Sequence, residues 1–184
     1  MGWKDEVVAP TCTIARSDKG FDYWVSRDYV SESLKGELQK AEVIFVPLEA
    51  FRDVPEELFP AQTTDFFHYV QDHLPTDIAA EIAISDDDYT EIALHANEVT
   101  LASLVVQAGV LPILTGIIAN FITTKLMSRK ENTQLTIKIY VEKKNGDVLK
   151  LDYSGPAKDF KEIVTSSFAS GQKLLDGEDK HNDK

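Results

Sequence analysis

The sequence feature that most constrains this chain is a stretch of 26 residues without a charged side chain, Val99–Thr124. A run of this length can cross about 30 Å of hydrocarbon or supply the centre of a protein core. On a helical projection of Val110–Leu126, bulky apolar residues cover one broad side, and smaller or more polar residues gather on the other: Thr115, Gly116, Ala119, Asn120 and Thr123. This segregation favours a helix lying across a sheet, with a kink near Gly109–Leu111 because Pro112 cannot donate a backbone hydrogen bond.

The segment after this stretch alternates as a β-hairpin does. Apolar residues occupy every second position of both strands: Leu135, Ile137, Ile139 and Val141, then Leu149, Leu151 and Tyr153. A two-residue Asn-Gly turn would oppose Val141 to Lys150, whereas a three-residue loop, Lys144–Gly146 with Gly146 left-handed, opposes Val141 to Leu149. The second register also pairs Lys138 with Asp152, and we predict it because a slip of one residue would bury the wrong face.

The rest of the chain predicts short elements in alternation. We expect a small hairpin over residues 11–25, a helix over 31–40, a strand over 42–46 buried on both faces, and a loop over 50–60. A helix from Thr63 or Thr64 to Leu74 follows, with Phe66, Tyr69 and Val70 inward, then strands over 78–85 and 89–96, and a last helix launched by Gly155-Pro156. The predicted fold is α+β: a largely antiparallel sheet covered by helices, including one long apolar helix with a Pro kink, and a C-terminal hairpin plus helix.

The domain organisation follows from the same pattern. We expect one α+β domain over residues 1–175, in which 1–40 form an N-terminal hairpin and helix layer and 41–175 the main sheet and helices. Residues 176–184 are polar and predict a disordered tail.

The charge balance restricts the partners. The chain has 31 acidic and 19 basic residues and a formal net charge of −12, which disfavours nucleic acids and anionic lipid surfaces. Its single cysteine, Cys12, cannot form an internal disulfide, and the N-terminus lacks the basic and apolar regions of a signal peptide. These features predict a cytoplasmic protein.

Candidate chemistry is sparse. His68 and His73 are five residues apart, which places them on different sides of a helix, and Cys12 has no histidine near it in sequence. An undetected metal-dependent hydrolase would need Glu81, Glu91 and the acidic run Asp86–Asp88 to converge, although the run lacks the spacing of a calcium loop. We therefore expect a non-enzyme with no cofactor and no metal.

The candidate partner-binding residues are Asp86, Asp87, Asp88 and Phe67. Three consecutive acids suit a solvated turn. Phe67 follows Phe66, and one helix stripe cannot bury both rings, so we expect one of the two to face outward.

Residues Leu101 to about Phe168 resemble the effector-associated constant component domains of bacterial conflict (anti-phage) systems. The resemblance rests on the apolar helix ending in basic residues (GVLPILTGIIANFITTKLMSRK), the strand–turn–strand (LTIKIYVEKKNGDVLKLDY) and the short helix after it (PAKDFKEIV). It implies a non-catalytic accessory module that acts through protein contacts. The chain departs from the pattern in its longer N-terminal portion and in Pro112, and the resemblance transfers no site residues.

Together these observations favour a non-catalytic protein–protein interaction or accessory component of a bacterial multi-component system, such as one in phage defence, whose partner is basic or a co-encoded effector. One alternative is a membrane-associated protein that inserts residues 99–124. Another is an acidic immunity protein that neutralises a basic toxin by electrostatic complementarity. The sequence leaves the oligomeric state open.

Overall fold

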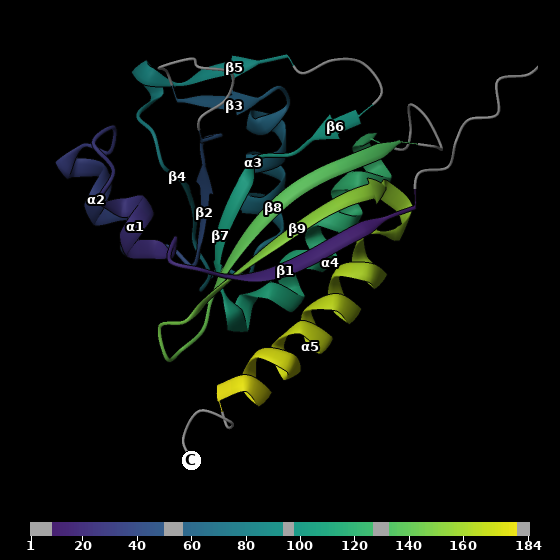
Figure 1. Cartoon of the computed structure of the whole chain (residues 1–184). Coiled ribbons are helices and arrows are strands. Elements are labelled where there is room, and N and C mark those ends of the chain that lie inside the picture. Colours follow the sequence, from purple (N-terminus) through teal and green to yellow (C-terminus); the bar gives the residue numbers. More distant parts are fainter. Residues whose placement is uncertain (1–8, 50–56, 94–97, 127–132, 180–184) are drawn as a thin grey trace, which may run out of the picture.

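The protein has an α+β fold, and the computed structural model describes residues 9–49, 57–93, 98–126 and 133–179 (Figure 1). The main sheet has seven strands, in the order β1 (Thr11–Ser17), β9 (Val148–Pro156), β8 (Gln134–Glu142), β7 (Ser103–Gln107), β2 (Val43–Val46) and β4 (Ala80–Ile82), while β6 (Glu98–Thr100) also pairs with β8. The pairing is antiparallel for β1–β9, β9–β8 and β7–β2, and parallel for β7–β8, β6–β8 and β2–β4. The predicted fold class is confirmed: the sheet is mixed and mostly antiparallel.

The uncharged stretch does not form one helix, and the prediction was wrong for its first part. Val99 and Thr100 belong to β6, which pairs with the start of β8. The next strand, β7, pairs with β8 farther along. Leu104 and Val106 of β7 contribute to the core under the helices, whereas Val105 belongs to a second core on the opposite face. A strand buried on both faces reads as a continuous apolar run, which explains why periodicity did not separate it from a helix.

The second part of the stretch forms α4 (Leu111–Phe121), after one 3₁₀ turn at Ala108–Val110 and before a π-helical turn at Ile122–Leu126. Pro112 lies in the first turn, where its missing N–H needs no partner, so it begins the helix and does not kink it. The predicted sides also differ from the structure at two positions. Thr115 is buried and its Oγ1 donates to the Pro112 carbonyl at 2.9 Å, whereas the Ile113 side chain is 43% exposed.

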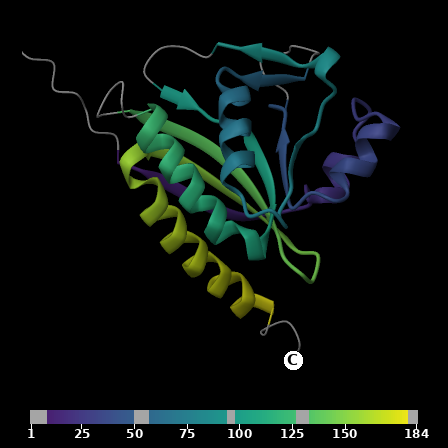
Figure 2. The same ribbon diagram turned by 180° about the vertical axis from the view of Figure 1, so that it is seen from behind.

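Helices cover both faces of the sheet (Figures 1 and 2). On one face α4 contacts both α3 (Thr63–His73) and α5 (Phe160–Asp179), and aromatic rings join this layer to the sheet. Phe66 of α3 lies 5.1 Å from Phe45 of β2 and 5.0 Å from Phe121 of α4, between ring centroids. On the other face, the segment containing α1 (Phe21–Val25) and α2 (Glu32–Leu38) packs over the β4 end of the sheet.

The predicted hairpin register is confirmed. Val141 pairs with Leu149, Ile139 with Leu151 and Lys138 with Asp152. Gly146 has φ of 91°, a left-handed conformation that favours glycine, and the Lys143 N–H donates to the Asp147 carbonyl at 2.8 Å, which leaves Lys144–Gly146 as the loop.

The hairpin predicted over residues 11–25 was wrong in its second half. Residues 21–25 form α1, and β1 pairs with β9, more than 130 residues later in the chain. The reason is the apolar face of β1: Cys12 and Ile14 lie opposite Tyr153 and Leu151 and extend the main core. The N-terminal segment is therefore partly a strand of the main sheet and partly a helical cover.

Three other boundaries also differ from the prediction. Residues 58–60, within the predicted loop, form β3 (Leu58–Pro60), which pairs in parallel with β5 (Thr90–Ile92) in a separate two-stranded sheet. The acidic run forms a 3₁₀ turn that connects β4 of the main sheet to β5 of the small sheet. Residues 94–97, at the end of the predicted strand over 89–96, lie outside the described residues. The last strand continues through Pro156 before the final helix, and α5 runs to Asp179, so residues 176–179 are helical and not the predicted tail.

The packing of α4 gives a direct test of the fold. We expect Leu114→Ala to lower the free energy of unfolding by about 2–5 kcal/mol, because Leu114 is fully buried between helix and sheet. Ile113→Ala, one residue away on the exposed side, is the matched control and should cost less than about 1 kcal/mol. Urea denaturation measures both, and equal losses would contradict this orientation of α4.

Candidate functional site

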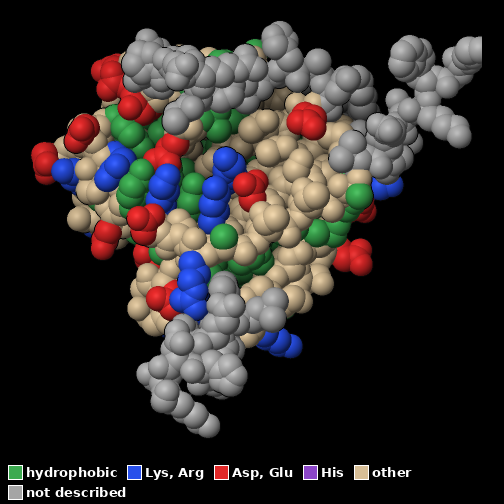
Figure 3. All heavy atoms as spheres, viewed as in Figure 1, with side chains coloured by type: hydrophobic (Ala, Val, Ile, Leu, Met, Phe, Trp, Pro, Cys, Tyr) green, Lys and Arg blue, Asp and Glu red, His purple; other side chains and the backbone are tan. Residues whose placement is uncertain are grey.

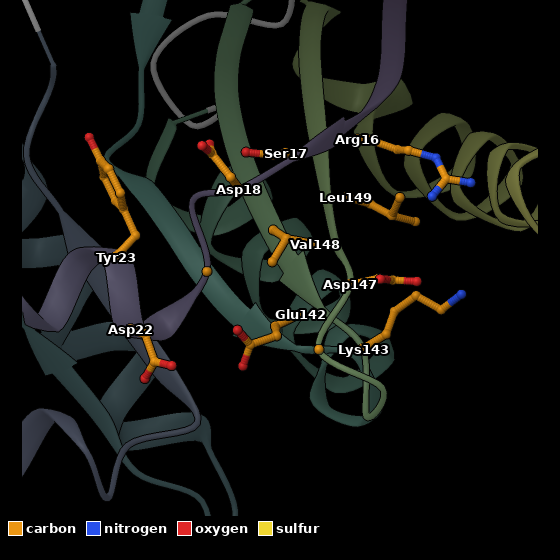
Figure 4. Close-up of a pocket in the computed structure, with 12 residues that line it drawn as sticks. Arg16, Ser17, Asp18, Asp22, Tyr23, Glu142, Lys143, Asp147, Val148 and Leu149 are labelled. Carbon is orange, nitrogen blue, oxygen red and sulfur yellow. The ribbon is translucent and has the colours of Figure 1, made fainter.

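The candidate site is a cleft of about 300 Å³ where β1 ends, α1 begins and the β8–β9 hairpin turns (Figure 4). Two chain segments far apart in sequence form its walls. They contribute Arg16, Ser17, Asp18, Gly20, Asp22 and Tyr23 from the N-terminal side, and Glu142, Lys143, Gly146, Asp147, Val148 and Leu149 from the hairpin.

The cleft exists because the hairpin extends beyond its neighbour. Ser17 is the last residue of β1 and pairs with Val148, so the hairpin residues 143–147 have no β1 residue beside them. After Ser17 the chain turns away, and the Ser17 Oγ accepts a hydrogen bond from the Lys19 N–H at 3.1 Å. The space left between this turn and the hairpin is the cleft.

Gly20 allows the two walls to approach closely. A Cβ atom at this position would lie 2.3 Å from Glu142 Oε1 and 2.9 Å from Val148 Cγ2, closer than such atoms can pack. Glu142 Oε1 accepts a hydrogen bond from the Phe21 N–H at 3.3 Å, which joins the end of β8 to the start of α1. Burial raises the pKa of the Glu142 carboxyl, the Phe21 N–H opposes that rise, and the nearby Asp22 carboxylate adds to it.

The charge of the cleft is predominantly acidic. Four carboxylates line it, on Asp18, Asp22, Glu142 and Asp147, against two basic side chains, on Arg16 and Lys143. Asp18, Asp22 and Asp147 are exposed. Carboxylates accept hydrogen bonds from ammonium and guanidinium groups, so this arrangement suits a cationic group on a ligand.

The α1 wall is fixed by packing beneath it. Trp24 is 1% exposed, its Nε1 donates to the Lys19 carbonyl at 3.1 Å, and its ring meets Tyr140 of β8 edge-on at 5.6 Å. Next to it, Tyr23 donates to Glu49, which also pairs with Lys19. The Glu49 carboxyl is partly desolvated, which would raise its pKa, but the hydrogen bonds from Lys19 and Tyr23 hold that pKa below its usual value.

A second polar cluster lies at the start of α3. The Tyr89 hydroxyl donates to Glu91 Oε1 at 2.6 Å, and Thr64 Oγ1 donates to the same oxygen at 3.2 Å. Burial and the Glu91 carboxylate raise the pKa of Tyr89 to about 12. The Glu91 carboxylate also accepts from the Thr64 backbone N–H at 3.5 Å, so this cluster joins the small sheet to the first turn of α3.

The sequence-predicted partner-binding residues lie elsewhere in the molecule. Asp86, Asp87 and Asp88 are exposed on their 3₁₀ turn, where the Ser85 hydroxyl donates to Asp88 Oδ2 at 2.9 Å. Phe67 is half-buried, and its ring lies edge-on against Phe45 at 5.1 Å. The acidic turn thus presents charge to solvent, while Phe67 contributes to the edge of the core.

The residues considered for chemistry are also dispersed. Glu81 lies on β4 of the main sheet and Glu91 on β5 of the small sheet, so the two do not face each other across adjoining strands. Burial raises the pKa of the half-buried Cys12 thiol. His95 and His181 fall outside the described ranges, and within those ranges no group of three or more His, Cys, Asp or Glu side chains could hold a metal ion.

One described helical segment, Ala108–Leu126, is long and apolar enough to cross a membrane, and half of it is buried within the protein. Sequence reasoning missed the cleft itself. The predicted register placed Glu142 and Asp147 on either side of one loop, but their assembly with Asp18 and Asp22 depends on the long-range β1–β9 pairing.

Comparison with known proteins adds no relative. The chain matches no protein-family model, no curated protein and no solved structure.

The pKa of Glu142 predicts a pH dependence. Because folding raises this pKa, the stability that Glu142 contributes is complete at low pH and is lost as the pH rises through the folded-state pKa. Glu142→Gln should therefore become more stable relative to the unsubstituted protein between pH 4 and pH 7.

Glu49→Gln is the control of opposite sign. The pKa of Glu49 is lowered, so its contribution is present at pH 7 and lost as the pH falls through the folded-state pKa. Urea titrations of the three proteins across this pH range measure the differences. A shift of the same sign for both variants would contradict these assignments.

Proposed function

We propose that this protein is a non-catalytic interaction protein that binds a basic segment of a protein partner at the acidic cleft. The observation that carries the proposal is the excess of carboxylates on the two walls of the cleft, with three of them exposed to an incoming group. Its volume of about 300 Å³ is at the lower end of the range for small-molecule pockets, about 300–1,000 Å³, which suits one inserted side chain.

The net charge of −12 supports the same partner chemistry. An acidic protein attracts basic partners over distances beyond direct contact, and complementary charge determines partner choice and association rate more than affinity. A role as accessory component of a bacterial multi-component system, as in phage defence, agrees with this chemistry, and so does neutralisation of a basic toxin.

Charge neutralisation within the cleft tests the proposal. We expect the triple variant Asp18→Asn, Asp22→Asn, Asp147→Asn to weaken partner binding about tenfold, because each exposed ion pair is worth about 0.2–1 kcal/mol. The partner is identified by purification with the full chain from its source cells, and its Kd is then measured by calorimetry.

The matched control neutralises the acidic turn: Asp86→Asn, Asp87→Asn, Asp88→Asn. It changes the net charge equally, and we expect it to retain the affinity of the unsubstituted protein within about twofold. Equal weakening by both variants would mean that affinity depends on the net charge alone and not on the cleft. Weakening by the control only would place the partner on residues 86–88 and contradict the proposal.

Membrane association through α4 is a second candidate. The observation that favours it is the outer side of α4, where Pro112, Ile113, Asn120 and Thr123 are exposed and no charge occurs before Lys125. Full insertion would have to remove Leu114 and Ile118 from the core beneath the helix.

Fractionation of the untagged protein separates the two candidates. We expect recovery in the soluble pool as a compact particle, because the buried side of α4 is already covered by the sheet and by α3 and α5. Release only by detergent, after washing with high salt, would favour the membrane candidate and contradict the first candidate, the interaction protein.

A further inference from the structure

The free edge of β1 is the feature that extends the proposed function. Among the described strands, β1 is the last at its side of the main sheet, and it pairs only with β9, over seven consecutive positions. Half of the backbone N–H and C=O groups of such a strand point away from the sheet, where they have no strand to pair with.

Within the described residues, this edge carries neither the proline nor the bulge that often protects an edge strand. Residues 11–17 contain no proline, the unbroken register excludes a bulge, and Arg16 is the one charged residue. Thr11, Thr13, Ala15 and Arg16 are exposed along the strand. α5 packs against β1 (Figure 1), on the face that carries Ile14: a Cβ at Gly171 would lie 3.0 Å from Ile14 Cδ1.

The charge along the edge is uneven. On the open face of the sheet, Thr11 lies beside Ser154 and Thr136 at the start of β1. Farther toward the cleft, Thr13 lies beside Asp152 and Lys138, and Ala15 beside Lys150. Figure 3 shows charged side chains over this face of the sheet as well as over the α1–α2 side. Because Arg16, Ser17 and Asp18 line the acidic cleft, the free edge runs directly into it.

We propose that the partner binds by strand addition: an extended segment pairs with the free edge of β1 and places a basic side chain, beyond Ser17, in the acidic cleft. The inference rests on the proposed function and specifies its mode. Backbone hydrogen bonds along β1 supply affinity without sequence preference, and the cleft selects for charge. A second copy of the chain is the weaker occupant, because it carries the same net charge of −12 and its own β1 offers one basic residue.

Designed peptides test this mode on the full chain. The probes are acetyl-Thr-Val-Thr-Val-Thr-Val-Arg-Arg-amide and acetyl-Arg-Arg-Val-Thr-Val-Thr-Val-Thr-amide, which suit the two strand directions. In the first set of control peptides, glutamates replace both arginines. In the second set, alternate backbone nitrogens are methylated along one edge of the peptide strand or along the other. Amide hydrogen exchange of the ¹⁵N-labelled protein reports on β1, residue by residue.

We expect at least one arginine peptide, at millimolar concentration, to slow exchange of the outward N–H groups of Thr11–Ser17 about tenfold. The glutamate peptides should bind less tightly, and methylation of the edge that pairs with β1 should abolish the protection. The cleft variant Asp18→Asn, Asp22→Asn, Asp147→Asn should remove the preference for arginine over glutamate and keep the protection by backbone pairing.

Other outcomes would overturn the inference, and they separate it from the proposed function. If an arginine peptide binds, loses affinity in the cleft variant and leaves β1 exchange unchanged, the cleft function stands and strand addition is wrong. If no peptide binds, strand addition is wrong, and the partner measurement of the cleft variant decides the function independently. If the outward N–H groups are protected without peptide, increasingly with protein concentration, the edge is occupied by a second copy.

Discussion

The burial of β7 on both faces is the constraint on which the rest of the structure depends. Its side chains alternate between the core under α3–α5 and the core under α1–α2, so this one strand holds both layers to the sheet. It pairs with β8 in parallel and β2 in antiparallel orientation, and α4 makes the crossover to β8. A parallel connection of this kind needs a helix across the sheet, which accounts for the apolar segment directly after β7.

The cleft is a consequence of where neighbouring strands end. Once β8 is fixed beside β7, the three-residue loop sets the β9 register, and β1 adds to β9 as far as Ser17. The hairpin continues past that point and α1 closes the space from the side, held by Trp24 against Tyr140. The acidic side chains therefore lie on a scaffold determined by apolar packing, and exposed substitutions among them should change binding more than folding.

The sequence predicted those parts of the fold that depend on local pattern. The hairpin register could be predicted because the two-residue period of a strand allows one apolar face, and residues 42–46 were predicted as a buried strand from their apolar run. Residues 21–25 were predicted incorrectly because β1 pairs with a segment 130 residues away, which no local pattern encodes. The prediction for residues 99–107 was wrong because a strand buried on both faces lacks the alternation of apolar and polar residues that marks most strands. The cleft could not be predicted because it combines two distant segments, residues 16–23 and 142–149, that meet only after the long-range pairing of β1 with β9.

Residue-resolved hydrogen exchange of the full chain, in aqueous buffer without lipid, tests whether the uncharged stretch forms the core of this fold in the absence of a membrane. We predict that the backbone amides of Leu104, Val105 and Val106 and those on the buried side of α4 are among the slowest to exchange, and that added lipid vesicles leave their exchange rates unchanged. Rapid exchange of these amides in buffer, with protection only after vesicles are added, would contradict it. The stretch would then belong to a membrane, and the cleft would lose its scaffold.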